Sequence, residues 1–352
     1  MKKYLLFVLL SIAFVACKNK QKNKEDFKQS FVSHTVDTLL TDDISIRALV
    51  IDGDKAWYAG SNGKFGWVSL SGDKDFSGVV AKDTLLPEFR AIAKTETDIF
   101  IINVGSLALL HKISKDGKRN KEVYTETGEK VFYDCMRFYN DKEGIAMGDP
   151  VNGCLALLTT KDGGETWTKQ PCGTMPKTAE GEAGFAASNT NIAVKGNKTW
   201  IASGGKKSRV FYSGDKGKTW EAFTTPIAQG TEMSGIFSMD FYDENIGFAV
   251  GGDYDKLTKN SGNKILTEDG GKTWKLVGEN TGFGYASCVQ FLPGSNGNEL
   301  VTAGPSGIYY SYDRGTSWKK LVDSKAFNTV QFADAKTIIA AGQKKIIRIK
   351  LE

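Results

Sequence analysis

Short apolar runs separated by polar turns recur along the chain from residue 44 to residue 350. In each unit an apolar run, a polar turn, and a second apolar run ending near glycine are followed by a third run. Residues 46–51 and 56–60 form one such pair, and residues 237–241 and 247–251 repeat it much later. Runs of this length bounded by Gly, Asp and Asn are typical of strands. The pattern predicts an all-β protein built from repeated small sheets.

A polar turn of the pattern Ser/Thr-x-Asp-x-Gly-x-Thr/Ser-Trp follows the third run in four units. The Asp can accept hydrogen bonds from backbone amides, and the Gly can adopt a positive φ. The Trp can then bury its indole in the adjoining sheet. Four copies indicate a repeat architecture in which these turns are structural. Their defining residues are Asp162, Trp167, Asp215, Trp220, Asp269, Trp274, Asp313 and Trp318.

Fainter copies at Asp73 and Asp116 extend the repeat, which recurs every 43 to 54 residues. This period fits a propeller blade of four antiparallel strands. The last unit, residues 329–350, supplies three strands and ends without the turn motif. Residues 33–40 are placed to provide its fourth strand, which predicts seven blades closed by an N-terminal strand. The alternative is six blades, with residues 329–350 completing the first.

The repeated turn is identified as the Asp-box, or BNR, repeat of sialidase-like propellers. Residues 44–350 as a whole resemble the photosystem II assembly/stability factor family, whose blades carry an Asp-Gly-Gly-x-Thr-Trp box. The resemblance implies a β-propeller and a partner-docking patch of arginines on successive blades. Because nothing in the chain indicates a photosynthetic context, we expect a docking patch of this kind but not a photosystem partner.

The first residues resemble a lipoprotein signal peptide. A basic start, an apolar run and a small residue before Cys17 predict cleavage of residues 1–16 and lipidation of Cys17. Residues 17–32 are expected to be a polar, Lys-rich tether, and residues 33–352 a single propeller domain. Lys18 directly after the lipidated Cys resembles the sorting signal for the outer membrane, facing the periplasm.

Composition excludes several classes of function. The formal net charge of +5 includes many lysines of the signal and tether, so it does not indicate nucleic-acid binding. With two histidines and no Cys-x-x-Cys motif, we expect no metal site, and no motif indicates a cofactor. An exported chain can form disulfides, although the sequence does not fix the pairing. The cysteines available are Cys135, Cys154, Cys172 and Cys288.

Alignment of the first strands places Arg47, Arg90 and Arg137 at one equivalent position. First strands line the axis of a propeller, so these side chains are expected at one mouth of the channel. Three guanidinium groups suit a carboxylate or phosphate partner. The alternative is a solvated ring of salt bridges with nearby acids. The same alignment places Thr190, Asp240, Gln290 and Gln331 in the remaining blades.

The expected function is therefore a non-catalytic, lipid-anchored envelope propeller that binds a protein or an anionic ligand at this mouth and works as a monomer. The alternative is a sialidase-like glycoside hydrolase. Its two acids would be Asp149 and Asp253, which follow second strands and should approach the same mouth. Aromatic residues in Gly-rich loops, Tyr254, Phe283 and Tyr285, are further contact candidates, or else anchors between blades.

Overall fold

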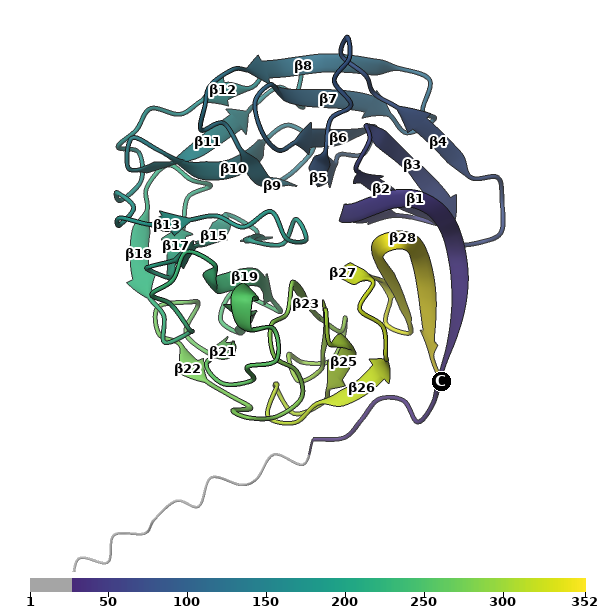
Figure 1. The fold of residues 1–352 in the computed structure, drawn as a ribbon, viewed down its shortest axis with the longest axis vertical. Coiled ribbons are helices and arrows are strands. Elements are labelled where there is room, and N and C mark those ends of the chain that lie inside the picture. Colours follow the sequence, from purple (N-terminus) through teal and green to yellow (C-terminus); the bar gives the residue numbers. More distant parts are fainter. Residues whose placement is uncertain (1–26) are drawn as a thin grey trace, which may run out of the picture.

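The computed structural model describes residues 27–352, which form a closed ring of antiparallel sheets around a central channel (Figure 1). Within this range the helical structure is one 3-10 turn, η1 (Tyr254–Lys256). No helix among these residues has the length and apolar character needed to cross a bilayer. The predicted all-β propeller is confirmed. The predicted cleavage site and Cys17 lie outside the described residues.

The strands of the first half of the ring come in consecutive groups of four. They are β1 (His34–Asp52), β2 (Lys55–Gly60), β3 (Lys64–Ser69), β4 (Phe76–Val79); β5 (Phe89–Lys94), β6 (Asp98–Asn103), β7 (Ala108–Ser114), β8 (Asn120–Glu126); and β9 (Tyr133–Phe138), β10 (Gly144–Val151), β11 (Cys154–Thr160), β12 (Thr168–Lys169).

The second half continues the series, and two short extra strands join the sheet of the fifth group. These strands are β13 (Glu182–Ala183), β14 (Ile192–Lys195), β15 (Lys198–Ala202), β16 (Gly204–Gly205), β17 (Arg209–Ser213), β18 (Glu221–Thr224); β19 (Ser234–Phe241), β20 (Gly247–Asp253), β21 (Lys264–Thr267), β22 (Lys275–Leu276); β23 (Cys288–Phe291), β24 (Leu300–Gly304), β25 (Gly307–Ser311), β26 (Lys319–Val322); and β27 (Phe327–Asp334), β28 (Thr337–Leu351).

The two ends of the chain close the ring in one shared sheet. The first arm of β1 pairs with β28 from His34↔Leu351 to Ser45↔Gln343, and its second arm pairs with β2. Closure by an N-terminal strand is therefore confirmed. Hydrogen bonding joins residues 27–352 into six sheets, which matches the six-blade alternative. Seven inner strands nevertheless face the channel, because the sheet shared by the two chain ends contributes two of them, β1 and β27, and each other sheet contributes one.

The repeated turns adopt one hydrogen-bonded form. In the turn after β17, Asp215 Oδ1 accepts from the amide of Thr219 at 2.9 Å and Oδ2 accepts from its hydroxyl at 2.7 Å. Gly217 has φ +82°, and the Trp220 indole donates to its carbonyl at 3.0 Å. Asp162, Asp269 and Asp313 accept the same pair of bonds. The turn residues therefore have the structural role expected of them.

The hydrophobic core is divided among the spaces between neighbouring sheets. Between the fourth and fifth groups, for example, Trp200 of β15 stacks on Phe241 of β19 with ring centroids 3.8 Å apart. Trp318, which follows a turn, packs edge-on to Phe248 of the preceding group at 6.0 Å. Large apolar side chains thus hold sheet to sheet.

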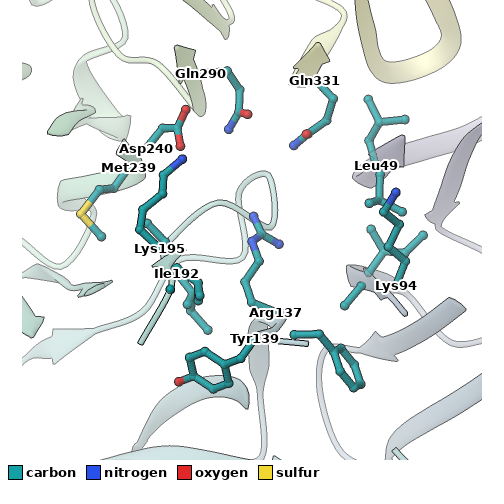
Figure 2. Close-up of a pocket in the computed structure, with 17 residues that line it drawn as sticks. Leu49, Lys94, Arg137, Tyr139, Ile192, Lys195, Met239, Asp240, Gln290 and Gln331 are labelled. Carbon is teal, nitrogen blue, oxygen red and sulfur yellow. The ribbon is translucent and has the colours of Figure 1, made fainter. Parts of the chain in front are cut away.

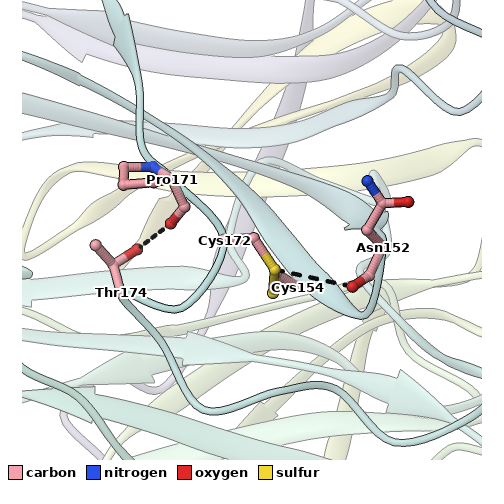
Figure 3. The surroundings of a disulfide bond; sticks show 5 residues. All are labelled: Asn152, Cys154, Pro171, Cys172 and Thr174. Carbon is pink, nitrogen blue, oxygen red and sulfur yellow. Dashed lines mark hydrogen bonds between the residues drawn. A yellow bond between two sulfur atoms is a disulfide. The ribbon is translucent and has the colours of Figure 1, made fainter.

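A disulfide joins the start of β11 to the long connection that follows β12. Cys154 and Cys172 have Cα atoms 5.5 Å apart and lie 18 residues apart in sequence (Figure 3). Cys135 and Cys288 are buried free thiols. The bridge belongs to the set of pairings that the sequence allowed, and it ties the connection between β12 and β14 to the start of β11.

Candidate functional site

Residues 184–191, in the connection between β12 and β14, fill the centre of the channel. Figure 1 shows this connection reaching into the middle of the ring. Residues 186–191 are buried. Asn189 accepts from the amide of Met136 and donates to the carbonyl of Ile92 at 2.7 Å. Ser188 donates to the carbonyl of Ser287 at 2.6 Å. We call residues 184–191 the plug, and it separates the channel into two mouths.

The plug was not predicted, although the sequence carries a weak signal for it. The connection is longer than those between other units and is rich in small and amide residues. Such residues can enter a narrow channel and satisfy their backbone groups there. Thr190, expected on a first strand, instead belongs to the plug and donates to the hydroxyl of Ser238 at 2.7 Å.

The three arginines do not share a mouth, which corrects the sequence alignment. Arg47 and Arg90 sit at bulges, one at the start of the part of β1 that pairs with β2 and one at the start of β5, where the register shifts between Ile46/Ala48 and Phe89/Ala91. The equivalent bulge of β9 is occupied by Asp134, because the pairing there jumps between Tyr133 and Cys135. Arg137 is three residues further along β9. An extra bulged residue is invisible in an alignment based on apolar pattern alone.

One opening, which we call the Arg47 mouth, lies where the inner strands begin. A cavity of about 180 Å³ there is bordered by Arg47, Tyr254, Leu257, Tyr285 and Lys325. The Arg47 guanidinium donates to the plug carbonyl of Ala187 at 3.0 Å. Burial and the neighbouring Arg90 lower the pKa of Arg47 from its ordinary value.

Aromatic rings form a continuous wall beside this mouth. Phe185 of the plug stacks on Phe237 with centroids 3.8 Å apart, and Tyr285 packs edge-on to Phe237 at 4.7 Å. Tyr254 is 43% exposed and contacts Tyr285 at 5.1 Å. Phe283 is buried and packs edge-on to Trp318 at 4.9 Å, so it acts as an anchor between sheets. Of the three aromatic candidates, Tyr254 is the one available to a partner.

Arg90 is engaged differently from Arg47. Its Nε and Nη2 atoms donate to Glu88 Oε1 at 2.9 and 2.6 Å. This is a local ion pair between residues two apart in sequence, and not part of a ring of salt bridges. The pair is partly exposed, so it contributes little to stability.

The opposite opening, which we call the Arg137 mouth, is a cavity of about 420 Å³. Figure 2 shows Arg137, Gln290 and Gln331 pointing into a common space from different inner strands. Asp240, Gln290 and Gln331 were therefore correctly aligned with Arg137. Lys94 and Lys195 also line the cavity and were not predicted. The inner strands contribute Leu49, Lys94, Arg137, Lys195, Asp240, Gln290 and Gln331.

The two acids of the hydrolase alternative have different surroundings. Asp149 borders a cavity of about 670 Å³, and burial raises its pKa to about 6 although the Gly184 amide donates to it at 2.9 Å. Asp253 caps η1 by accepting from Asp255 and forms an ion pair with Lys256 at 3.3 Å. Burial raises the pKa of the neighbouring Asp134 well above its ordinary value, and the charge of Asp149 adds to that rise.

Asp134 was not predicted as a site residue. Neither of its carboxylate oxygens has a hydrogen-bond partner among residues 27–352, which fits a protonated, neutral side chain. A side chain at Gly184 of the plug would place its Cβ 2.5 Å from Asp134 Oδ2. Asp134 and Asp149 therefore flank the point where the plug enters the channel. No group of three His, Cys, Asp or Glu side chains suited to a metal ion occurs in the described part of the chain.

Comparison with known proteins defines the class of this one. No protein-family model matches the chain, and no curated protein matches it. Among solved structures, YCF48 bound to D1 peptide is similar with a TM-score of 0.62 and 14% identity, over 92% of this chain and 98% of that one. YCF48 from Cyanidioschyzon merolae gives 0.62 and 12%, over 91% and 99%. A streptogramin B lyase gives 0.66 and 15%, over 92% and 100%.

At these identities the likeness is one of fold. The chain is a β-propeller, and its neighbours in structure include a photosystem II assembly factor, YCF48, as well as an enzyme.

Proposed function

We propose that this protein is a non-catalytic, lipid-anchored propeller of the cell envelope that binds a segment of another protein at the Arg47 mouth. The observation that carries the proposal is the combination of exposed apolar side chains with cations there. Tyr254 and Leu257 are 43% and 39% exposed and lie beside Arg47 and Lys325. Aromatic and arginine side chains are enriched where proteins bind one another.

The charges at this mouth favour a partner that carries a carboxylate. Arg47 donates only to the Ala187 carbonyl, and its Nε has no partner among residues 27–352. Lys325 is exposed. The plug closes the channel behind these groups, so a partner would dock on the mouth and not pass through. The solved neighbour YCF48 carries a bound D1 peptide, which supports peptide binding by a propeller of this kind.

The envelope location rests on the sequence before Cys17 and is supported by chemistry within the ring. A disulfide such as Cys154–Cys172 is typical of exported proteins. The first described residues already belong to the domain, since Phe31 packs on Tyr310 with centroids 4.6 Å apart. Replacing Cys17 by Ser should release the protein from the membrane fraction into the soluble fraction. Retention of the Cys17→Ser variant in the membrane fraction would contradict the anchor.

Docking is tested by a photo-crosslinking amino acid placed at Tyr254 in cells that make the protein. The matched control carries the same amino acid at Lys118, an exposed side chain in the turn after β7. We expect a discrete adduct from position 254, absent from position 118 and lost when Arg47 is replaced by Ala. Equal adducts at both positions, or an adduct insensitive to Arg47→Ala, would remove the assigned surface.

A hydrolase is the second candidate, favoured by one observation. Asp149, with a pKa of about 6, borders the largest of the cavities described here and has the character of a general acid. Glycoside hydrolysis needs a second carboxylate across the bond, and Glu129 and Glu180 border the same cavity. Turnover of a glycoside panel that stops in Asp149→Asn would favour this candidate over the binding platform.

A further inference from the structure

The Arg137 mouth has features of a binding site that the docking of a protein segment does not use. The plug separates it from the Arg47 mouth, and its cavity of about 420 Å³ lies in the range of small-molecule sites. Apolar side chains of Leu49, Ile192 and Met239 form part of the wall, and polar groups converge on the space between them (Figure 2). Apolar walls with a few converging polar groups are typical of ligand pockets.

Positive charge in this cavity is only partly neutralised. Arg137 donates to the main-chain carbonyls of Met136 and Asn189, which are neutral, so its charge has no ionic partner in the part of the chain that the structure describes. A guanidinium has five N–H groups, so donors remain after these two bonds. Lys195 forms no ion pair within 4.0 Å among residues 27–352. Lys94 shares the carboxylate of Asp52 with Lys115, at 3.1 and 2.8 Å.

The single carboxylate among the residues that line the cavity does not cancel these cations. Asp240 accepts from the amides of Phe241 and Phe291 at 2.9 and 2.8 Å. Burial raises its pKa, and the nearby cations Lys195 and Arg137 oppose that rise. Two or three cations therefore face one acid that backbone donors already bind. The cavity keeps a net positive potential.

Two amides complete the set. The side chain of Gln331 makes no hydrogen bond within the described structure, and the side chain of Gln290 uses only its Nε2, which donates to the Val289 carbonyl at 3.0 Å. Side-chain amides donate and accept, so they suit hydroxyl groups. The half-buried carboxylate of Asp240 is a further acceptor for a hydroxyl.

We propose that the Arg137 mouth binds a small polyhydroxylated anion, in which a carboxylate or phosphate contacts Arg137 and Lys195 and hydroxyl groups contact Gln290, Gln331 and Asp240. Such a ligand uses every polar group of the cavity that lacks a full set of partners. A neutral sugar would leave the cations unpaired, and a peptide backbone offers too few hydroxyls. A phosphorylated and a carboxylated sugar present the same chemistry here.

The test is isothermal titration of the intact mature protein with glucose 6-phosphate, glucuronate and glucose. We expect one of the two anions to bind and glucose to bind at least about tenfold more weakly. The stronger anion identifies the head group. Raising the salt concentration should weaken binding, because the contact is largely electrostatic. Absence of binding by both anions at about 10 mM, or equal binding of glucose, would overturn the proposal.

Variants locate the site. Lys195→Gln and Gln331→Leu touch neither the plug nor the Arg47 mouth, and each should weaken anion binding by about fivefold to tenfold. Arg137→Gln should do so more strongly, although it also removes a bond to the plug. Lys118→Gln, in the exposed turn after β7, is the matched control and should leave anion affinity unchanged. Anion binding insensitive to both Lys195→Gln and Gln331→Leu would place the ligand elsewhere and contradict the assignment.

This outcome is independent of the proposed docking function. Lys195→Gln should not affect the crosslink from Tyr254, since the two positions lie on opposite sides of the plug.

Discussion

The two mouths lie at opposite ends of one ring of inner strands and have different chemistry. The Arg47 mouth combines cations with an aromatic wall of which Tyr254 is exposed, whereas the Arg137 mouth is a larger cavity lined by cations and amides. Arg47 and Arg137 differ by only three residues in their place along equivalent strands. The position of a side chain along its inner strand therefore decides which opening it faces, because the plug lies between the two openings.

The plug is the reason that the channel has two separate mouths. Without it, both sets of side chains would line one continuous tube. Both arginines hold it, Arg47 through the carbonyl of Ala187 and Arg137 through that of Asn189. Changes that loosen the plug are therefore expected to affect both mouths.

The largest effect is expected from removal of the disulfide in the connection that leads to the plug. Replacing Cys154 and Cys172 by Ser frees a loop of 18 residues, which should lower the free energy of unfolding by about 3 kcal/mol. Urea denaturation measures the change. The wild-type protein in reductant should match the variant, and reductant should have no further effect on the variant. Unchanged denaturation midpoints would show that the bridge does not constrain the plug.

A smaller, pH-dependent effect is expected from Asp149, which binds the plug at Gly184. Burial raises the pKa of this carboxyl from 3.8 to about 6, so the folded state holds its proton more tightly than the unfolded chain does. The resulting stability is present in acid and is lost as the pH rises from about 4 to about 6. Asp149→Asn should therefore be more stable than the wild type at pH 7, by roughly 2 kcal/mol.

The measurement is thermal or urea unfolding of both proteins across this range. At pH 3.5 the two should agree closely, since both side chains are then neutral. Parallel pH profiles would show that Asp149 is not perturbed in the folded state.

The smallest effect is expected at the repeated turns, which lie outside both mouths. Asp215→Ala removes the acceptor for Thr219 and Ser213 and should cost about 1 kcal/mol of stability. Bonds from the backbone and hydroxyl of Thr219 lower the pKa of Asp215 to about 2. The stability that it contributes is present above about pH 4 and is lost as the pH falls toward 2.

Asp73→Ala is the matched control, because its turn has no following Trp, and its effect should stay below about 0.5 kcal/mol. Neither variant should change ligand binding at either mouth. Loss of anion binding or of the Tyr254 crosslink in Asp215→Ala would show that the turns do more than support the sheets.

Much of the fold could be predicted because it depends on local signals that repeat. The alternation of apolar runs and turns identified the strands, and the four Asp–Gly–Trp turns identified the repeat. Closure by the N-terminal strand followed from a last unit that lacked a fourth strand. The number of sheets was less accessible, because β1 is a single strand that pairs with β28 through its first arm and with β2 through its second.

The site was predicted in part, and the errors have a single kind of cause. Asp240 and Gln331 were aligned with Arg137 because each lies three residues past the position where the register of its strand shifts, as Arg137 does, and the strand of Gln290 pairs without a shift. Arg47 and Arg90 were misaligned because each occupies a bulge, which adds a residue without changing the apolar pattern. Lys94 and Lys195 lie at strand ends, where a lysine normally faces solvent, so the sequence did not indicate them as site residues.

By itself, the sequence determined the all-β repeat, the structural turns and the candidates for the inner strands, because each depends on residues close together in the chain. The tertiary structure alone decided which side chains share an opening, since that depends on bulges and on how far each strand reaches along the channel. It also decided that residues 184–191 divide the channel, because their polar groups find hydrogen-bond partners only when the distant strands of the ring surround them.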